Sequence, residues 1–186
     1  MKIWPRPVNN LRKLKLYIAV SFDHFIARAN GDVSWLELPE YTIPGEDYGY
    51  QKFYDSIDSC IMGHTTYKII QGFDIPFPYT GKKNYVFSHQ KDLQNNGDVV
   101  FVKEDMASFV SKLKRETGQD IWLIGGGQIN QILLNYNLID EIILTVMPIM
   151  LGHGVKLFQG VVKEKKLNLV QSKQYSNGVL QLKYVR

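Results

Sequence analysis

The feature that most constrains the fold is a run of three glycines between a strand-like and a helix-like segment. Residues 121–124 form a short apolar run, and residues 125–127 are all glycine. After the glycines, apolar side chains recur at helical spacing, namely Ile129, Ile132, Leu133 and Tyr136. Such a turn lets a ligand approach the backbone, and the helix start presents unpaired N–H groups to an anion. The stretch predicts either a phosphate-binding turn or a tight turn between packed elements.

A second turn of the same kind lies earlier in the chain and adds hydroxyl groups. The apolar residues 59–62 are followed by Gly63, His64, Thr65 and Thr66, and then by a helix-like segment. Neither turn is a known nucleotide fingerprint. The run at residues 125–127 lacks the third spaced glycine of the dinucleotide motif and the Gly-Lys-Ser/Thr of a Walker loop.

The composition is that of an ordinary globular protein and excludes several classes of protein. The chain has 186 residues, of which 45% are hydrophobic and 22% charged, and this suits a domain with a real core. A net charge of +4 fits an anionic small ligand. The sequence contains no stripe of basic residues with interleaved aromatics, so we expect no nucleic-acid partner. Cys60 is the single cysteine, which excludes an internal disulfide and a Cys-x-x-Cys zinc motif and indicates a reducing compartment. We therefore expect no bound metal.

The ends and the apolar runs predict where the protein resides. No apolar run reaches membrane-spanning length, and residues 1–15 lack the features of a signal peptide. We therefore expect a cytoplasmic protein without a membrane partner. Residues 1–13 are interpreted as an N-terminal extension and residues 14–186 as one domain.

Strand-like and helix-like segments alternate, which predicts an α/β fold with a mostly parallel sheet. The expected strands are residues 14–20, 59–62, 83–87, 98–102, 121–124 and 142–147. Helices are expected from Glu46 to Ile57, over residues 67–70, from Asp105, and after the triple glycine. Asn177-Gly178 between residues 167–175 and 179–185 predicts a C-terminal antiparallel hairpin. Residues 33–45 and 148–158 are expected to be loops.

Several separate stretches carry a family resemblance when they are taken together and in order. They are residues 18–23, 61–67, 86–88 and 124–127, and Pro148 with residues 151–158. On these residues the chain resembles the dihydrofolate reductase-like family, and within it the reductase domain of bacterial bifunctional riboflavin deaminase-reductases. The resemblance implies a three-layer α/β/α fold, an NADPH cofactor, a small-molecule substrate and a homodimer. It also implies that the Gly125–Gly126 peptide is cis.

The resemblance also assigns residues to the cofactor. Backbone groups of Ala19 and Ile26 would hold the nicotinamide amide, and Ser88 would reach the adenosine 2′-phosphate. The whole set is Ala19, Ile26, Gly63, His64, Thr65, Thr66, Ser88, Gly125, Gly126, Gly127, Gln128 and Ile129. His64 stands where the family usually has arginine, and a neutral imidazole is a poorer partner for a phosphate. NADH is therefore a possible cofactor as well, although His89 and Lys91 could compensate.

The leading functional hypothesis is a reductase that transfers hydride to a polar heterocycle or to a ribosylaminopyrimidine-type substrate, as an oxidoreductase of the class that acts on CH–OH or CH–NH type groups. The resemblance implies activity like that of 5-amino-6-(5-phosphoribosylamino)uracil reductase, and no catalytic residue is assigned. The candidate pocket residues are Asp32, Trp35, Asp47, Tyr50, Phe53, Tyr54 and Thr145. Several of them have a structural alternative: Asp32 as a turn former, Trp35 and Tyr54 as core, Asp47 as a helix-start charge, and Thr145 as a strand residue.

Two other functions remain open. Dihydrofolate reductases carry an acidic residue on the helix that matches residues 46–57, and the matching position here is Gly49. The missing acid argues against dihydrofolate reduction, since that reaction needs a proton beside the hydride. It also keeps open a nucleotide-binding module of reductase descent without turnover. Oxidation of NADPH in the presence of pterin and ribosylaminopyrimidine substrates would separate these functions.

Overall fold

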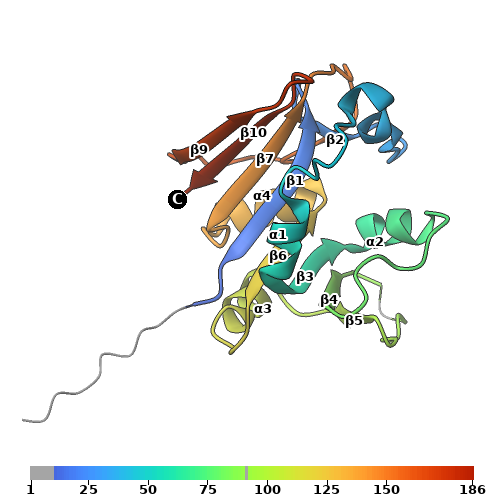
Figure 1. Cartoon of the computed structure of the whole chain (residues 1–186). Helices are drawn as coiled ribbons and strands as arrows, with labels where there is room; N and C mark the ends of the chain where they lie inside the picture. The colour runs from blue at the N-terminus through green and yellow to red at the C-terminus, as the bar shows by residue number, and fades with distance from the viewer. Residues whose placement is uncertain (1–10, 91) are drawn as a thin grey trace, which may run out of the picture.

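The computed structural model describes residues 11–90 and 92–186, so most of the predicted extension lies outside the described residues (Figure 1). Its centre is an eight-stranded sheet. In spatial order the strands are β5 (Val99–Val102), β4 (Lys83–Phe87), β3 (Ile57–Gly63), β6 (Asp120–Gly125), β1 (Leu14–Ser21), β7 (Glu141–Met147), β10 (Leu180–Val185) and β9 (Asn168–Gln174). Neighbours from β5 to β7 pair in parallel, whereas β10 is antiparallel to β7 and β9. The predicted parallel sheet and C-terminal hairpin are confirmed.

Helices cover both faces of the sheet, which confirms the three-layer α/β/α fold. The helices are α1 (Tyr50–Asp55), α2 (His64–Gln71), α3 (Met106–Leu113) and α4 (Gly127–Asn135). Alternate strand residues point to opposite faces. Leu16 and Leu123 pack in a core with residues of α3 and α4. Trp122 packs on the other face with residues of α1 and α2.

The helix predicted to begin at Glu46 begins at Tyr50 instead. Gly49 precedes it with a φ of 79°, a left-handed conformation that cannot continue an α-helix. The carboxylate of Asp47 accepts hydrogen bonds from the backbone N–H groups of Gly49 and Gln51, both at 2.8 Å. Asp47 and Gly49 therefore belong to the turn that starts the helix, and neither lies on the helix itself.

The two predicted loops contain short elements that the sequence did not indicate. Residues 33–45 include the 3-10 helices η1 (Ser34–Glu37) and η2 (Pro39–Tyr41). Within residues 148–158, β8 (Val155–Lys156) pairs with β2 (Phe25–Ala27) in a small second sheet. Elements of two or three residues are too short for a periodic pattern to reveal them. In the described part of the chain, no helix is long and apolar enough to cross a membrane.

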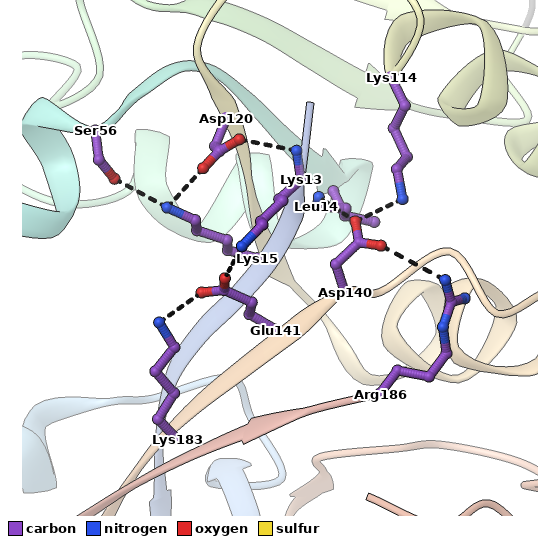
Figure 2. A network of polar contacts seen from close by, with 10 residues as sticks. All are labelled: Lys13, Leu14, Lys15, Ser56, Lys114, Asp120, Asp140, Glu141, Lys183 and Arg186. Carbon is purple, nitrogen blue, oxygen red and sulfur yellow. Dashed lines mark hydrogen bonds and ion pairs between the residues drawn. The ribbon is translucent and has the colours of Figure 1, made fainter. Parts of the chain in front are cut away.

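An ion-pair network lies at the amino ends of the central strands (Figure 2). Each of its three carboxylates receives at least one lysine. The pairs are Lys13 and Lys183 with Glu141, Lys15 with Asp120, and Lys114 and Arg186 with Asp140. The Glu141 residue is only 5% exposed. Burial acts to raise the pKa of Glu141, but the hydrogen bonds and charges of Lys13 and Lys183 outweigh it and lower the pKa.

We expect Glu141→Gln to lower the free energy of unfolding by about 1–2 kcal/mol at pH 7, because both lysines then lose their charged partner. A carboxyl whose pKa is lower in the folded state stabilises the fold at pH values above its unfolded-state pKa of 4.5. That stabilisation is lost as pH falls through the folded pKa, so parent and variant should converge in acid. Urea unfolding at several pH values measures this. Glu104→Gln, which breaks the exposed pair with Lys112, is the control and should change little.

Candidate functional site

A large cleft lies at the carboxyl ends of five parallel strands. Its volume is about 1190 Å³, and its lining residues follow β5, β4, β3, β6 and β1 across the sheet. This edge is where open α/β sheets bind ligands. The volume exceeds the roughly 300–1,000 Å³ of ordinary small-molecule sites, so the cleft has room for a cofactor and a second molecule.

Two helices start in this cleft from glycines that provide no side-chain cap. Helix α2 follows Gly63 and α4 follows Gly126, and neither N-cap residue makes a side-chain hydrogen bond to its helix. In contrast, Asp105 caps α3 by accepting a 2.8 Å hydrogen bond from the N–H of Ser108. The amide groups at the starts of α2 and α4 are therefore available to an anionic ligand, and the helix dipoles favour one.

The two glycine turns face one another closely. A Cβ placed on Gly126 would lie 3.3 Å from the Oγ1 of Thr66, and one on Gly63 would lie 3.2 Å from the Cδ1 of Ile129. Gly127 is glycine for another reason, since its Cβ would come within 2.2 Å of the backbone oxygen of Lys156. The Gly125–Gly126 peptide is cis, as predicted. Gly126 thus leaves open the space between the turns, whereas Gly127 permits packing against β8.

His64 and Ser88 form a polar pair beside the start of α2. The Nδ1 of His64 and the Oγ of Ser88 are 3.3 Å apart, so one of them donates a hydrogen bond to the other. Burial, helped by the positive charge of Lys68, lowers the pKa of His64. The imidazole is therefore neutral at pH 7. His89 and Gln90 also line the cleft here, while Lys91 lies outside the described residues.

The opposite end of the cleft, near β6 and β1, is aromatic. We call it the aromatic end and define it by Tyr17, Tyr50, Tyr79 and Trp122, which all line the cleft. The ring centres of Tyr79 and Tyr50 lie 5.2 Å and 5.9 Å from that of Trp122. The indole N–H of Trp122 donates a 3.0 Å hydrogen bond to the backbone oxygen of Tyr17. Burial raises the pKa of both Tyr17 and Tyr50 to about 12, so both are neutral phenols.

The structure brings the predicted cofactor residues together. All of them except Gly125 line the cleft: Ala19, Ile26, Gly63, His64, Thr65, Thr66, Ser88, Gly126, Gly127, Gln128 and Ile129. Gly125 is buried at the end of β6. Their contact with a cofactor stays a prediction.

Of the predicted substrate residues, Tyr50 lines the cleft and three other aromatic residues do not. Trp35 is fully buried and packs with Tyr41, Met147, Tyr175 and Val179, so its expected place in the pocket is corrected to the core. Phe53 is buried and stacks on Tyr17 with ring centres 4.3 Å apart. The ammonium group of Lys82 lies over the ring of Tyr54, 4.4 Å from the ring centre.

The three polar candidates are also placed outside the cleft. Asp32 forms a turn, because its carboxylate accepts hydrogen bonds from the N–H and Oγ of Ser34. The carboxylate of Asp47 accepts hydrogen bonds in the turn before α1, and those from Gln51 and Gly49 lower its pKa. Thr145 is buried and accepts a 3.1 Å hydrogen bond from Gln181. All three residues therefore have the structural roles that the sequence offered as alternatives: turn former, helix-start charge and strand residue.

Tyr17, Tyr79 and Trp122 line the cleft but are not among the pocket residues predicted from the sequence. Two of them could have been predicted from strand alternation, because residues two apart lie on the same face of a strand. Tyr17 shares its face with Ala19, and Trp122 shares its face with Ile124. Tyr79 lies in a proline-containing loop before β4, where no period marks its direction.

The sequence matches the family model of the RibD C-terminal domain over residues 12–181. The chain belongs to this family. A relative in the same size range, the uncharacterized protein YwjB of Bacillus subtilis (strain 168), is 40% identical over 175 residues, 94% of this chain and 98% of the relative. The resemblance stated from the sequence motifs is thereby confirmed.

Solved structures show the same fold. A "putative riboflavin biosynthesis protein" from Shewanella sp. PV-4 superposes with a TM-score of 0.82 at 30% identity, covering 94% of this chain and 98% of that one. A diaminohydroxyphosphoribosylaminopyrimidine deaminase/5-amino-6-(5-phosphoribosylamino)uracil reductase from Thermotoga maritima gives a TM-score of 0.71 at 14% identity. The match covers 94% of this chain but 56% of the Thermotoga chain, so it shows the fold alone.

Proposed function

We propose that this chain is a reductase that binds NADPH in the cleft and transfers hydride to a C=O or C=N carbon of a substrate with a flat heterocycle, so that a CH–OH or CH–NH group is formed. The observation that carries the proposal is the meeting of two uncapped helix starts at Gly63 and Gly126 within one large cleft. Such a site suits a diphosphate. The name of the Thermotoga neighbour, which includes 5-amino-6-(5-phosphoribosylamino)uracil reductase, supports the same class of reaction.

The residues present fit a dinucleotide. The space that a Cβ on Gly126 would fill, beside the hydroxyl of Thr66, is where the diphosphate would lie against both helix starts. Ser88 and His64 would meet the adenosine ribose and its 2′-phosphate. Ala19 and Ile26 would hold the nicotinamide near the aromatic end. When bound, NADPH supplies the hydride, and the protein contributes position and the exclusion of water.

The neutral His64 sets an expectation for cofactor choice. A fixed guanidinium would favour the 2′-phosphate strongly, whereas a neutral imidazole contributes a hydrogen bond without charge. Fluorescence titration with NADPH and with NADH at pH 7 tests the proposal directly. Saturable binding of NADPH, with a modest preference over NADH, is the expected result. The absence of saturable binding of either nucleotide would overturn the proposal.

One observation favours a second function, that of a nucleotide-binding module without turnover. Among the described residues that line the cleft, the carboxylates and imidazoles are those of Glu104, Asp105, His64 and His89, and all of them follow β3, β4 or β5 at the other end from Trp122. NADPH binding without any oxidation across pterin and ribosylaminopyrimidine substrates would favour this module. Turnover with any of these substrates would favour the reductase.

The expected homodimer remains a proposal, and we assign it to the edge strand β9 and not to β7. The apolar residues of β7 are explained within one chain, because β7 lies between β1 and β10 and is largely buried. Exposed apolar side chains gather instead on and before the edge strand β9, where Leu167, Leu169 and Val170 are 36%, 53% and 54% exposed. An exposed edge strand that carries apolar side chains is a surface for pairing with a second copy.

Light scattering at micromolar concentration should give twice the chain mass of 21.5 kDa. We expect Leu169→Lys to shift the protein to the monomer, since it replaces an exposed apolar side chain of the edge strand by a charged one. Phe22→Lys changes a side chain that is 63% exposed in the turn after β1, and it should leave the mass unchanged. A parent that scatters as a monomer would contradict the proposal.

A further inference from the structure

The aromatic end of the cleft differs in charge from the end near β5. Among the described residues that line the cleft, Lys103 is the one lysine and no arginine is present. Lys103 directly follows β5, and the sheet order places β4, β3 and β6 between β5 and β1. Four strand spacings of roughly 4.8 Å put these ends about 19 Å apart. This distance exceeds the Debye length of about 8 Å at physiological salt, so Lys103 cannot neutralise an anion near Tyr17.

Three cations on neighbouring segments are held by other groups. Lys82 donates hydrogen bonds to the backbone oxygens of Tyr54 and Ile57, and Arg28 pairs with Asp32. Lys15, on the same strand face as Tyr17, pairs with Asp120 at the amino ends of the strands (Figure 2). A phosphate at the aromatic end would therefore lose water without gaining any of these cations, which is costly.

The same end is well suited to an uncharged ring. Tyr17, Tyr50, Tyr79 and Trp122 present ring surfaces, and flat π-systems stack on such surfaces. Within residues 11–90 and 92–186, the hydroxyls of Tyr50 and Tyr79 have no hydrogen-bond partner. Because both are neutral phenols, each can donate a hydrogen bond to a ring nitrogen or a carbonyl oxygen.

We infer that the substrate of this chain is a flat, uncharged heteroaromatic molecule with hydrogen-bond acceptors on its edge, and that it carries no phosphate. The inference rests on the proposed function, since the cofactor would take the glycine turns and leave the aromatic end for the substrate. It separates this chain from a reductase of phosphoribosyl compounds, which would need a cation at this end.

A matched pair of fluorescent probes tests the inference. Both 7-methoxy-4-methylcoumarin and 4-methylumbelliferyl phosphate contain the same flat ring with a carbonyl acceptor, but only the second is an anion. The full chain is first titrated with NADPH, and each probe is then titrated with and without the nucleotide. We expect the uncharged coumarin to bind at least tenfold more tightly than the phosphate. Equal or tighter binding of the phosphate overturns the inference.

Variants locate the binding. Tyr50→Leu should lower the affinity for the uncharged probe at least fivefold, and Tyr50→Lys should shift the binding preference toward the phosphate probe. Tyr184→Leu alters a half-buried tyrosine that packs in the core on the α3 and α4 side, and it should leave both affinities unchanged. An equal loss in Tyr50→Leu and Tyr184→Leu overturns the inference. The parent comparison needs no variant, so it decides the matter even where a variant folds poorly.

The NADPH titration separates the two proposals. If NADPH fails to bind while the coumarin is still preferred, the proposed function fails and the assignment of the aromatic end stands. If NADPH binds and the phosphate probe is preferred, the reductase proposal stands and the inference about the substrate fails.

Discussion

Gly126→Val is expected to reduce the affinity for NADPH at least 100-fold while the protein remains folded. The backbone of Gly126, with φ of −82° and ψ of −163°, lies in an extended region that valine adopts. Its Cβ would have two neighbours within 4 Å, both side-chain atoms: the Oγ1 of Thr66 at 3.3 Å and the Cδ1 of Ile26 at 4.0 Å. The valine methyl groups would fill the space between the starts of α2 and α4 that a diphosphate needs.

Other glycines provide the controls. Gly97 precedes β5, and a Cβ there would meet nothing within 4 Å, so Gly97→Val should change neither affinity nor stability. Gly127→Ala is expected to unfold or distort the chain, because its Cβ would lie 2.2 Å from the backbone oxygen of Lys156. Gly126 is therefore the position that separates binding from folding.

Fluorescence titration measures the affinity, and thermal unfolding shows whether the variant is folded. Gly126→Ala provides a milder change if the valine variant is poorly produced. Unchanged NADPH affinity in a folded Gly126→Val protein would show that the diphosphate does not lie between the two glycine turns.

The second large effect concerns dihydrofolate, which we expect this protein to reduce at least 100-fold more slowly than an ordinary enzyme turns over its substrate. General acid–base help contributes roughly 10²–10⁴-fold, and ordinary turnover is about 1–10³ per second. Among the described lining residues, the carboxylates are Glu104 and Asp105, which follow β5. Asp47 accepts two backbone hydrogen bonds that lower its pKa, so it is an anion that cannot donate a proton at neutral pH.

The structure also selects the variant that tests this expectation. Gly49 has a left-handed backbone and does not line the cleft, so Gly49→Asp should add no activity. Tyr50, one residue later, lines the cleft and begins α1, where a carboxylate is tolerated. Tyr50→Asp is therefore the variant expected to gain turnover, measured as loss of NADPH absorbance with dihydrofolate. Ordinary rates in the parent would contradict our account of the missing acid.

Much of the fold follows from local sequence signals. The strand over residues 83–87 and the hairpin around Asn177-Gly178 are found where the sequence predicts them, because alternation and turn residues act over a few positions. Helix α1 was misplaced because acidic residues at 46 and 47 look like a helix start. In the structure the same carboxylate of Asp47 closes a turn before the helix. A helix-start signal thus predicts that a cap exists more reliably than which residue begins the helix.

By itself the sequence determined the glycine turns at Gly63 and Gly126, since a backbone that follows a strand and opens a helix needs few distant partners to form. Only the tertiary structure decided the aromatic end of the cleft. Tyr17, Tyr50, Tyr79 and Trp122 come from β1, α1, a loop and β6, and no local pattern brings them together. The tertiary structure also decided that Trp35 lies in the core, where it packs with Met147 and Val179, residues that are distant from it in the sequence. Which face of a sheet or loop remains open depends on what packs against it, and that is a property of the assembled layers.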